Sequence, residues 1–260
     1  IIVLCNESFA KLFGKSTKEL LNQPISILYS SIAGENIIEK YKQNFIQGMV
    51  KDYLEASAVL WNAEKLFFEI SNSIIEDPNG KRFVLSIFRD TSERKVNQVL
   101  LEKKGRILQG IAKATNALIT DSDYLDGFNT ALRILGESAE ADRVYIYKHM
   151  EDEETGELYF TPLYEWTADG IDSQLNDSLL GKLSYSRFAA LNFYESFSNG
   201  ESLKFIVKDL AKEYQKVFFD GNIRSIILVP ILIDGAYWGF IGFDECHSDR
   251  IWSSDEESIL

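Results

Sequence analysis

Residues that build metal, haem and nucleophilic sites are scarce in this sequence. It contains two cysteines and two histidines among 260 residues. Cys5 and Cys246 lie in different halves of the chain and make no disulfide framework, so we expect a reducing, cytoplasmic location. No Ser-His-Asp set, paired-acid motif or glycine-rich phosphate loop is present. We therefore expect no catalytic residues in this chain.

Basic residues and long apolar runs are also in short supply. The chain has 27 lysines and arginines against 40 acidic residues, a formal net charge of −13, which argues against binding to nucleic acid or to a membrane surface. The longest apolar run, Ile226 to Ile233, contains Pro230 and is too short to cross a membrane. Because the sequence begins at Ile1 within an apolar run, we expect a fragment of a larger protein, which can still carry membrane segments upstream.

The clearest structural signal lies between Ile226 and Asp244. Two apolar runs of strand length flank Asp234-Gly235, a pair that favours a two-residue hairpin turn with positive φ at both positions. Apolar residues occupy both sets of alternating positions, a pattern typical of strands that are covered on both faces. We therefore predict a hairpin at the centre of a sheet, with helices nearby.

The first third of the chain changes from helical to strand periodicity near Asp52. Before that point, Asn6 and a capping box of Ser16 and Glu19 predict two short helices. After it, three alternating segments are separated by turns at 61–64 and 77–80. This order predicts short helices followed by an antiparallel meander of three strands.

This segment resembles a PAS domain. The resemblance rests on N-E-S-F-A-K-L-F-G-K-S-T-K-E-L-L at 6–21, E-D-P-N-G at 76–80 and the closing R-D-T-S-E-R-K at 89–95. It implies a PAS-like sensor domain over residues 1–90, whose first strand is missing before Ile1. The segment has no histidine, so we expect no haem in it. Cys5 lies away from the position of the flavin-adduct motif of photosensory relatives, and we expect it to act as a small buried hydrophobe.

A linker helix is predicted to leave this domain over residues 91–118. Asp90 is placed to cap it, and Glu93 completes a capping box. Apolar residues recur largely on one helical face: Val96, Leu100, Ile107, Ile111, Ala114 and Leu118. Such a stripe packs either on its own domains or on a second copy of the chain. We expect a parallel homodimer, with a signal-relay role for Asp90, Thr91, Glu93, Leu100 and Ile111.

The remaining sequence resembles a GAF domain. The resemblance rests on L-Y-E-W-T-A-D-G-I-D-S-Q-L-N at 163–176 and on the stretch 224–252 around the predicted hairpin. It implies a GAF-like sensor domain over residues 119–260: a six-stranded antiparallel sheet with helices on one side and a small-molecule pocket on the other. Trp166, Tyr185 and Phe188 flank its loops and are candidates for ligand binding, with ordinary core packing as the alternative for each. The expected fold class is α+β, with two domains that are joined by a helix.

Cys246-His247 resembles a metal-binding or chromophore-binding pair. Two neighbouring residues supply only two of the four ligands of a structural zinc site, and no C-x-x-C or H-x-x-x-H motif supports them. Bilin-binding GAF domains carry their Cys-His before the V-P-I strand, whereas here the pair follows that strand. The segment 243–245 also lacks the spacer of the cyclic-nucleotide signature F-x-x-x-D-E. We therefore expect no metal, no covalent bilin and no cyclic nucleotide, while another small ligand remains open.

PAS and GAF domains in tandem resemble the sensory input region of a bacterial or archaeal sensor histidine kinase. The expected function is non-catalytic signal transduction, by binding a small ligand or by relaying a signal to a kinase domain after Leu260. Two alternatives stay open: the input region of a diguanylate cyclase or phosphodiesterase, and a dimerisation scaffold without ligand. A GAF lineage that reduces methionine sulfoxide uses several cysteines, so Cys246 alone argues against that activity.

Overall fold

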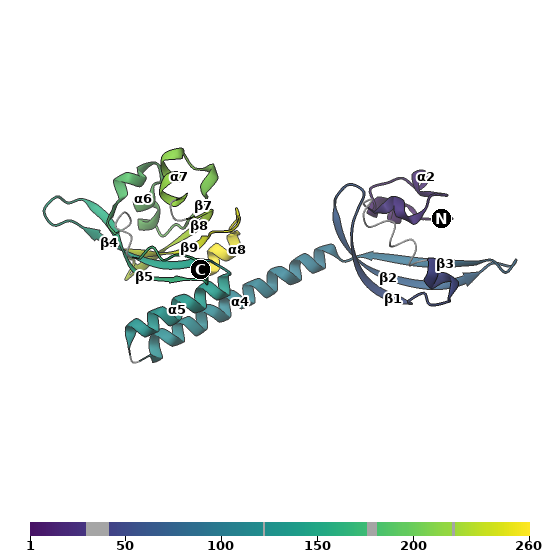
Figure 1. Ribbon diagram of the computed structural model, residues 1–260, viewed down its shortest axis with the longest axis horizontal. Helices are drawn as coiled ribbons and strands as arrows, with labels where there is room; N and C mark the ends of the chain where they lie inside the picture. Colours follow the sequence, from purple (N-terminus) through teal and green to yellow (C-terminus); the bar gives the residue numbers. More distant parts are fainter. Residues whose placement is uncertain (30–41, 122, 176–180, 220–221) are drawn as a thin grey trace. The chain divides into compact units, whose positions relative to one another are not determined.

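The computed structural model describes residues 1–29, 42–121, 123–175, 181–219 and 222–260 (Figure 1). These residues form two compact units, Ile1–Leu100 and Leu101–Leu260. Each unit contains an antiparallel sheet and helices, so the predicted α+β class is confirmed. No helix in the described part of the chain is both long and apolar enough to span a membrane.

The first unit is a three-stranded antiparallel meander preceded by short helices. Its strands lie in the order β1-β2-β3: β1 (Tyr53–Val59), β2 (Lys65–Glu76) and β3 (Arg82–Asp90). Before them come α1 (Glu7–Leu12), α2 (Thr17–Leu20) and the 3-10 helix η1 (Ile25–Leu28). The Asn6 side chain caps α1, and the predicted capping box of Ser16 and Glu19 begins α2.

The core of the first unit lies on one face of this sheet. Leu66 and Phe68 of β2 are buried on that face and pack with Phe13 from the helical segment. On the opposite face, Leu85 and Ile87 of β3 are 50% and 64% exposed. This difference follows from the two-residue period of a strand, which sends successive side chains to opposite faces.

The second unit is built around a six-stranded antiparallel sheet in the order β6-β5-β4-β9-β8-β7. The strands are β4 (Arg143–Glu151), β5 (Leu158–Thr167), β6 (Leu183–Ser184), β7 (Leu203–Ile206), β8 (Ser225–Ile233) and β9 (Ala236–Glu245). Figure 1 shows α5 (Tyr124–Ala139) and the adjoining part of α4 (Ser92–Thr120) on one side of the sheet, with α6 (Phe193–Ser198) and α7 (Lys212–Phe219) on the other. The 3-10 helices η2 (Tyr185–Leu191) and η3 (Val207–Asp209) and the last helix, α8 (Ser254–Ile259), complete the unit.

The central hairpin has the predicted turn. Asp234 and Gly235 have φ values of 54° and 77°, so both turn positions lie in the left-handed region. At the start of β8, four consecutive residues from Ser225 to Leu228 are buried, which requires cover on both faces of the sheet. Ile226 belongs to the core on the α6–α7 side, and Ile227 to the core on the α5 side.

Candidate functional site

A small cavity lies on the α6–α7 face of the six-stranded sheet. Its volume is about 50 Å³, enough for a few water molecules but well below the roughly 300–1,000 Å³ of pockets for drug-sized ligands. Most of its wall is apolar or aromatic: Tyr145, Tyr147, Phe160, Leu183, Phe188, Phe193, Val217, Phe218, Ile223, Ile226, Leu228 and Phe240. Glu165 and Gln174 add polar groups to this lining.

Packed aromatic rings form the walls of the cavity. Phe188 and Phe193 stack with ring centroids 4.9 Å apart, and Tyr147 and Phe240 stack at 5.3 Å. Phe160 contacts both pairs, with its centroid 5.8 Å from that of Phe188 and 5.3 Å from that of Phe240. Each such contact contributes about 0.5–1.5 kcal/mol beyond the burial of area. Enlarging the cavity therefore requires several rings to move together.

A buried cluster of charges adjoins the cavity. Arg143 and Asp244 face one another in the β4–β9 register, and their side chains, 2% and 0% exposed, form an ion pair at 3.0 Å. The Tyr145 hydroxyl donates to the other carboxylate oxygen of Asp244 at 3.1 Å. A second carboxylate, that of Glu165, lies 3.4 Å from Nε of Arg143. One cation thus faces two carboxylates away from water, which requires that the charges be paired and hydrogen-bonded.

Glu165 also ties the loop after β5 to the sheet. Its carboxylate accepts hydrogen bonds from the backbone N–H of Gln174 at 2.9 Å and from the Ser173 hydroxyl. Arg143 holds the same loop by donating to the carbonyl of Asp172 at 2.9 Å. Because Gln174 lines the cavity, the charge cluster fixes part of the cavity wall.

Burial shifts the protonation equilibria of this cluster. Loss of solvation raises the pKa of Asp244 to about 7, although the charge of Arg143 and the hydrogen bonds from Arg143 and Tyr145 act in the opposite direction. Burial also raises the pKa of Tyr145 well above its ordinary value, and the nearby Asp244 adds to this effect. Tyr145 therefore remains a neutral donor to the Asp244 carboxylate, which is paired with Arg143.

The three aromatic residues proposed from the sequence lie in different surroundings. Phe188 lines the cavity, and Tyr185 is buried nearby with its hydroxyl oxygen 2.9 Å from that of Tyr237. Trp166 lies in the core on the opposite face, where its ring packs against Gly136 of α5. The structure thus brings Tyr185 and Phe188 to the cavity side and places Trp166 away from it. Their part in ligand binding stays a prediction.

A β-bulge explains the position of Trp166. Phe160 faces the cavity, and strict alternation along β5 would place Trp166 on the same face. The β4–β5 register shifts midway along the strands, so that Glu165 pairs with Tyr145 and shares its face. Sequence reasoning missed Glu165 for this reason. The signal that remains is an acidic residue inside an otherwise apolar strand.

The predicted relay residues lie just before α4 and along it. Asp90 accepts a hydrogen bond from the backbone N–H of Ser92 at 2.8 Å, and Thr91 is buried. Glu93 is exposed in the first turn of the helix. Leu100 and Ile111 are half-buried. A role of these residues in signal relay stays a prediction.

Within the second unit, the predicted apolar stripe of α4 is covered only in part: Ile107 and Ala114 are buried, whereas Leu118 is 44% exposed. Ile107, Gly110 and Ala114 are buried along one side of α4, and at Gly110 this side meets the Ser138 side chain of α5. Packing on its own domain was the alternative left open by the sequence. A separate series of apolar residues is exposed at 67%, 55% and 77%: Leu101, Leu108 and Ile119.

Ion pairs join α4 to α8 within the second unit. Lys103 and Arg250 lie 2.9 Å and 2.6 Å from Glu256, and Lys104 lies 2.8 Å from Asp255. Although burial opposes ionisation, hydrogen bonds from Lys103, from Arg250 and within the local capping box lower the pKa of Glu256 to about 2. The two lysines that interrupt the apolar stripe in the sequence therefore have a structural role, which local periodicity does not reveal.

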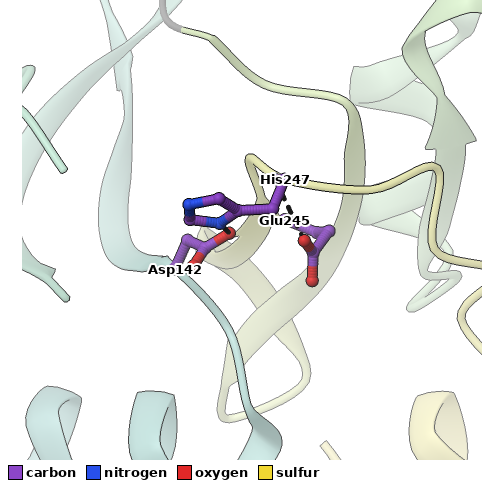
Figure 2. Close-up of side chains that lie close together, drawn as sticks. All are labelled: Asp142, Glu245 and His247. Carbon is purple, nitrogen blue, oxygen red and sulfur yellow. Dashed lines mark hydrogen bonds and ion pairs between the residues drawn. The ribbon is translucent and has the colours of Figure 1, made fainter. Parts of the chain in front are cut away.

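A third group of side chains gathers where β4 begins and β9 ends (Figure 2). Nδ1 of His247 lies 2.9 Å from Oδ2 of Asp142, and Glu245 accepts the backbone N–H of His247 at 3.0 Å. The hydrogen bond to Asp142 raises the pKa of His247. Burial raises the pKa of the Cys246 thiol to about 12, which disfavours its thiolate form.

Family models match both halves of the chain. Residues 1–93 match the model of the PAS domain, and residues 123–260 match that of the GAF domain. These matches confirm the tandem order that was expected from the sequence.

Two curated relatives are histidine kinases by name. The methanogenesis regulatory histidine kinase FilI of Methanothrix harundinacea is 31% identical in an alignment of length 260, which covers 99% of this chain and 29% of that protein. The circadian input-output histidine kinase CikA of Synechococcus elongatus is 23% identical over 170 residues, which cover 61% of this chain and 22% of that protein. The chain thus spans less than a third of the length of either relative.

Similar solved structures include two proteins that bind chromophores. The chromophore-binding domain of Stigmatella aurantiaca phytochrome P1 is 13% identical, with a TM-score of 0.46 over 97% of this chain and 84% of that chain. The phycocyanobilin-bound GAF domain of a cyanobacterial phytochrome is 15% identical, with a TM-score of 0.47 over 58% of this chain and 85% of that chain.

Proposed function

Because this chain belongs to the GAF domain family and carries a PAS domain ahead of its GAF domain, we propose that it is the non-catalytic sensory input region of a sensor histidine kinase. In this proposal the GAF domain binds a small ligand, and helices α4 and α8 relay the change to a kinase domain elsewhere in the parent protein. The names of both curated relatives support a histidine kinase as the parent.

The observation that carries the ligand proposal is an aromatic cavity with polar groups on one part of its wall. Tyr145 offers a hydroxyl, and Glu165 and Gln174 lie in the same lining. A small apolar molecule with one polar group fits this chemistry. At about 50 Å³ the cavity takes only a few heavy atoms unchanged, so a larger ligand enters by displacing rings or the loop that Glu165 holds.

The proposed relay starts in β4 and β9, because each strand lines the cavity on one face of the sheet and packs into the α5-side core on the other. Tyr145 and Phe240 line the cavity from β4 and β9, while Val144 and Phe243 of the same strands belong to the core on the α5 side. A movement of the ring wall therefore shifts the surface on which the helices pack. Glu256, which is bound to Lys103, then couples α8 to α4.

Thermal unfolding with small probes tests the ligand proposal. Isobutanol, isobutyrate and isobutylamine differ only in their polar group, and phenol adds a ring, so their ranking reports the charge and shape that the cavity accepts. A ligand at about 100 times its Kd stabilises the protein by roughly 2.7 kcal/mol, which raises Tm by about 5–10 °C for a unit of this size. Val217→Phe, which fills the cavity, should abolish this shift, whereas Ile251→Phe at an exposed position should keep it.

The same variants carry the test into the parent protein. In the full-length kinase, Val217→Phe should remove the response of autophosphorylation to the probe, and Ile251→Phe should preserve it. No Tm shift with any probe, or an equal shift in the cavity-filled variant, contradicts ligand binding in the cavity. The second candidate, a dimerisation scaffold without ligand, is favoured by the small volume of the cavity and would then stand.

We further propose that the chain forms a homodimer along α4. Leu101 and Leu108 are exposed and one heptad apart, and Ile119 continues the exposed series, so the pairing face differs from the buried stripe. Leu108→Glu should weaken the dimer in light scattering while each domain stays folded. Ile107→Glu, one residue earlier and buried, should unfold the second unit. A wild-type chain that stays monomeric at hundreds of micromolar would contradict the proposal.

The proposal includes no bound chromophore. The Cys246 thiol is the cysteine of the second unit, and its raised pKa, about 12, disfavours the thiolate that forms a covalent bilin link. The purified protein should therefore be colourless above the aromatic absorption band. A visible absorption peak near one equivalent per chain that survives gel filtration would overturn this expectation.

A further inference from the structure

Three side chains of metal-ligand type converge at one end of the six-stranded sheet. Arg143 pairs with Asp244 in the register, so the residues just beyond this pair, Asp142 before β4 and Glu245 and His247 at the end of β9, come together. One ligand atom from each of the three lies within 4.8 Å of the others. Figure 2 shows the imidazole ring over the Asp142 carboxylate, with Glu245 beside it.

The donor set of one imidazole nitrogen and two carboxylate oxygens has a defined preference. Zinc, cobalt and nickel ions accept this mixture, whereas calcium and magnesium ions prefer oxygen ligands alone. Among the hydrogen bonds of the described residues, Asp142 uses its Oδ2 and Glu245 its Oε1. One oxygen of each carboxylate is therefore not used in these hydrogen bonds. Nδ1 of His247 lies 2.9 Å from Asp142 Oδ2, so an ion binds the imidazole at Nε2 or replaces this hydrogen bond. The side chain of His247 is 71% exposed, so an ion has access from solvent.

The backbone beneath these ligands is held by the sheet. The N–H of Asp142 donates to the carbonyl of Asp244 at 2.8 Å, and the carbonyl of Asp142 accepts from Ala168 at 2.8 Å. The carbonyl of Glu245 accepts from the N–H of Arg224 at 2.9 Å. A site whose ligands sit on fixed backbone loses less entropy when it binds.

We propose that Asp142, Glu245 and His247 bind one divalent transition-metal ion of the zinc, cobalt or nickel type. Three protein ligands leave an open coordination position for water. The inference goes beyond the proposed ligand cavity, which lies elsewhere in the unit, and it departs from the expectation drawn from the sequence. That expectation considered only the neighbours Cys246 and His247, whereas Asp142 is 105 positions from His247 along the chain.

An ion at this site would cross-link the start of β4 to the end of β9. Both strands also carry the charge cluster of Arg143 and Asp244, one residue away from the site. The chain then continues from His247 through Arg250 to α8, which is bound to α4. Metal occupancy would thus stiffen the segment between the sheet and the relay helices, as an input separate from the cavity.

Calorimetric titration of zinc chloride into the chelator-washed chain tests this site. We expect saturable binding of one equivalent per chain, no response to magnesium, and a rise in Tm with zinc that follows the same stoichiometry. His247→Ala and, independently, Glu245→Gln should weaken binding at least about tenfold. The metal-free Tm of each variant should stay near that of the wild type, because His247 is exposed and Glu245→Gln keeps an oxygen that can accept the backbone N–H groups of His247 and Ser248.

Two matched variants separate the site from general surface binding. His149→Ala removes the other histidine of the chain, and Glu153→Gln removes an exposed carboxylate from the turn after β4, so both should bind zinc as the wild type does. A wild type that binds no zinc overturns the proposal. Zinc uptake that is unchanged in His247→Ala, or that spreads over several equivalents, also overturns it, because the ion would then be adventitious and the cluster an ordinary turn.

Discussion

The two sheets differ in how many of their faces are covered, and this difference decides where charge can be placed. In β2 of the PAS domain, burial alternates through Leu66, Phe68 and Ile70, so that every second position can face water. In β8 of the GAF domain, four consecutive residues are buried. A charged residue that is buried in a sheet covered on both faces cannot reach solvent, so it needs a partner inside the protein.

The ion pairs of the two domains illustrate this contrast. At the PAS sheet, Arg89 of β3 and Arg94 of α4 approach Glu69 at 3.5 Å and 3.3 Å, and both arginine side chains are 78% exposed. Pairs of this kind contribute about 0–1 kcal/mol. In the GAF sheet, Arg143 and Asp244 are almost fully buried, so that removing one partner leaves an unpaired charge away from water.

The largest expected effect is therefore the loss of the buried cation. Arg143→Met should lower the free energy of unfolding of the GAF domain by about 3–5 kcal/mol, because Asp244 and Glu165 lose their counter-ion. The matched change in the PAS domain, Arg89→Met, should cost less than about 1 kcal/mol. Urea unfolding of both variants measures the difference. Equal losses of free energy of unfolding in the two variants would show that burial of the sheet faces does not determine how much an ion pair stabilises the domain.

A glycine in a covered strand should show the next largest effect. A Cβ at Gly239 of β9 would overlap the backbone carbonyl of Tyr147 on the neighbouring strand, and backbone cannot move aside as a side chain can. Gly239→Ala should therefore lower the free energy of unfolding by about 2–3 kcal/mol.

Gly235 in the turn of the same hairpin provides the comparison. It has a φ of 77°, and a Cβ added there would meet no atom within 4 Å. Gly235→Val should cost about 1–2 kcal/mol, from backbone strain alone. Melting midpoints that rank in the reverse order would contradict this reasoning.

Features that depend on near neighbours were predictable from the sequence. Asp234 and Gly235 predicted a turn with positive φ at both positions, and Ser16 with Glu19 predicted a capping box; the structure confirms both. Each of these features depends on residues within three positions of one another. Chain-local chemistry therefore predicted the element types, whereas the tandem order of the domains was expected from the resemblance to the two families.

The candidate sites depend on longer-range geometry and were largely unpredictable. Trp166 faces away from the cavity because a bulge in β5 reverses the alternation, and an added residue of this kind leaves no mark in the hydrophobic period. Asp142 meets His247, and Lys103 meets Glu256, only because of the order of strands and helices in space. A single sequence carries no local signal for such partners.

A matched pair of capping boxes sharpens the comparison through pH. Glu19 in the PAS domain and Glu256 in the GAF domain both accept hydrogen bonds from the serine three positions before them, and both have a lowered pKa. A carboxylate whose pKa is lower in the folded than in the unfolded state stabilises the folded protein at pH values above its unfolded pKa. This stabilisation is lost as the pH falls through its folded pKa. For Glu256 the loss runs from about pH 4.5 towards pH 2.

Glu256→Gln should therefore remove about 1–2 kcal/mol of this acid-dependent stability, with solvent screening allowed for. Glu19→Gln should leave the acid slope of unfolding nearly unchanged, because Glu19 is exposed to solvent. Urea unfolding at intervals between about pH 2 and about pH 6 gives the pH dependence of the free energy of unfolding for both variants. A steeper change for Glu19→Gln than for Glu256→Gln would show that burial does not control the two boxes.

The smallest expected effect lies on the open face of the PAS sheet. Ile87 is 64% exposed there, so Ile87→Lys should change the free energy of unfolding by less than about 0.5 kcal/mol, whereas Ile70→Lys, on the buried face of the same sheet, should unfold the domain. Light scattering on the same samples reports the oligomeric state, so that the test also shows whether a second copy of the chain covers the outer face of the PAS sheet. If Ile87→Lys dissociates an oligomer or lowers Tm as strongly as a core substitution, the outer face is covered by a second copy in solution. The PAS sheet would then be a two-sided sheet completed between chains, and its apolar residues Leu85 and Ile87 would serve the purpose that helices serve for the GAF sheet.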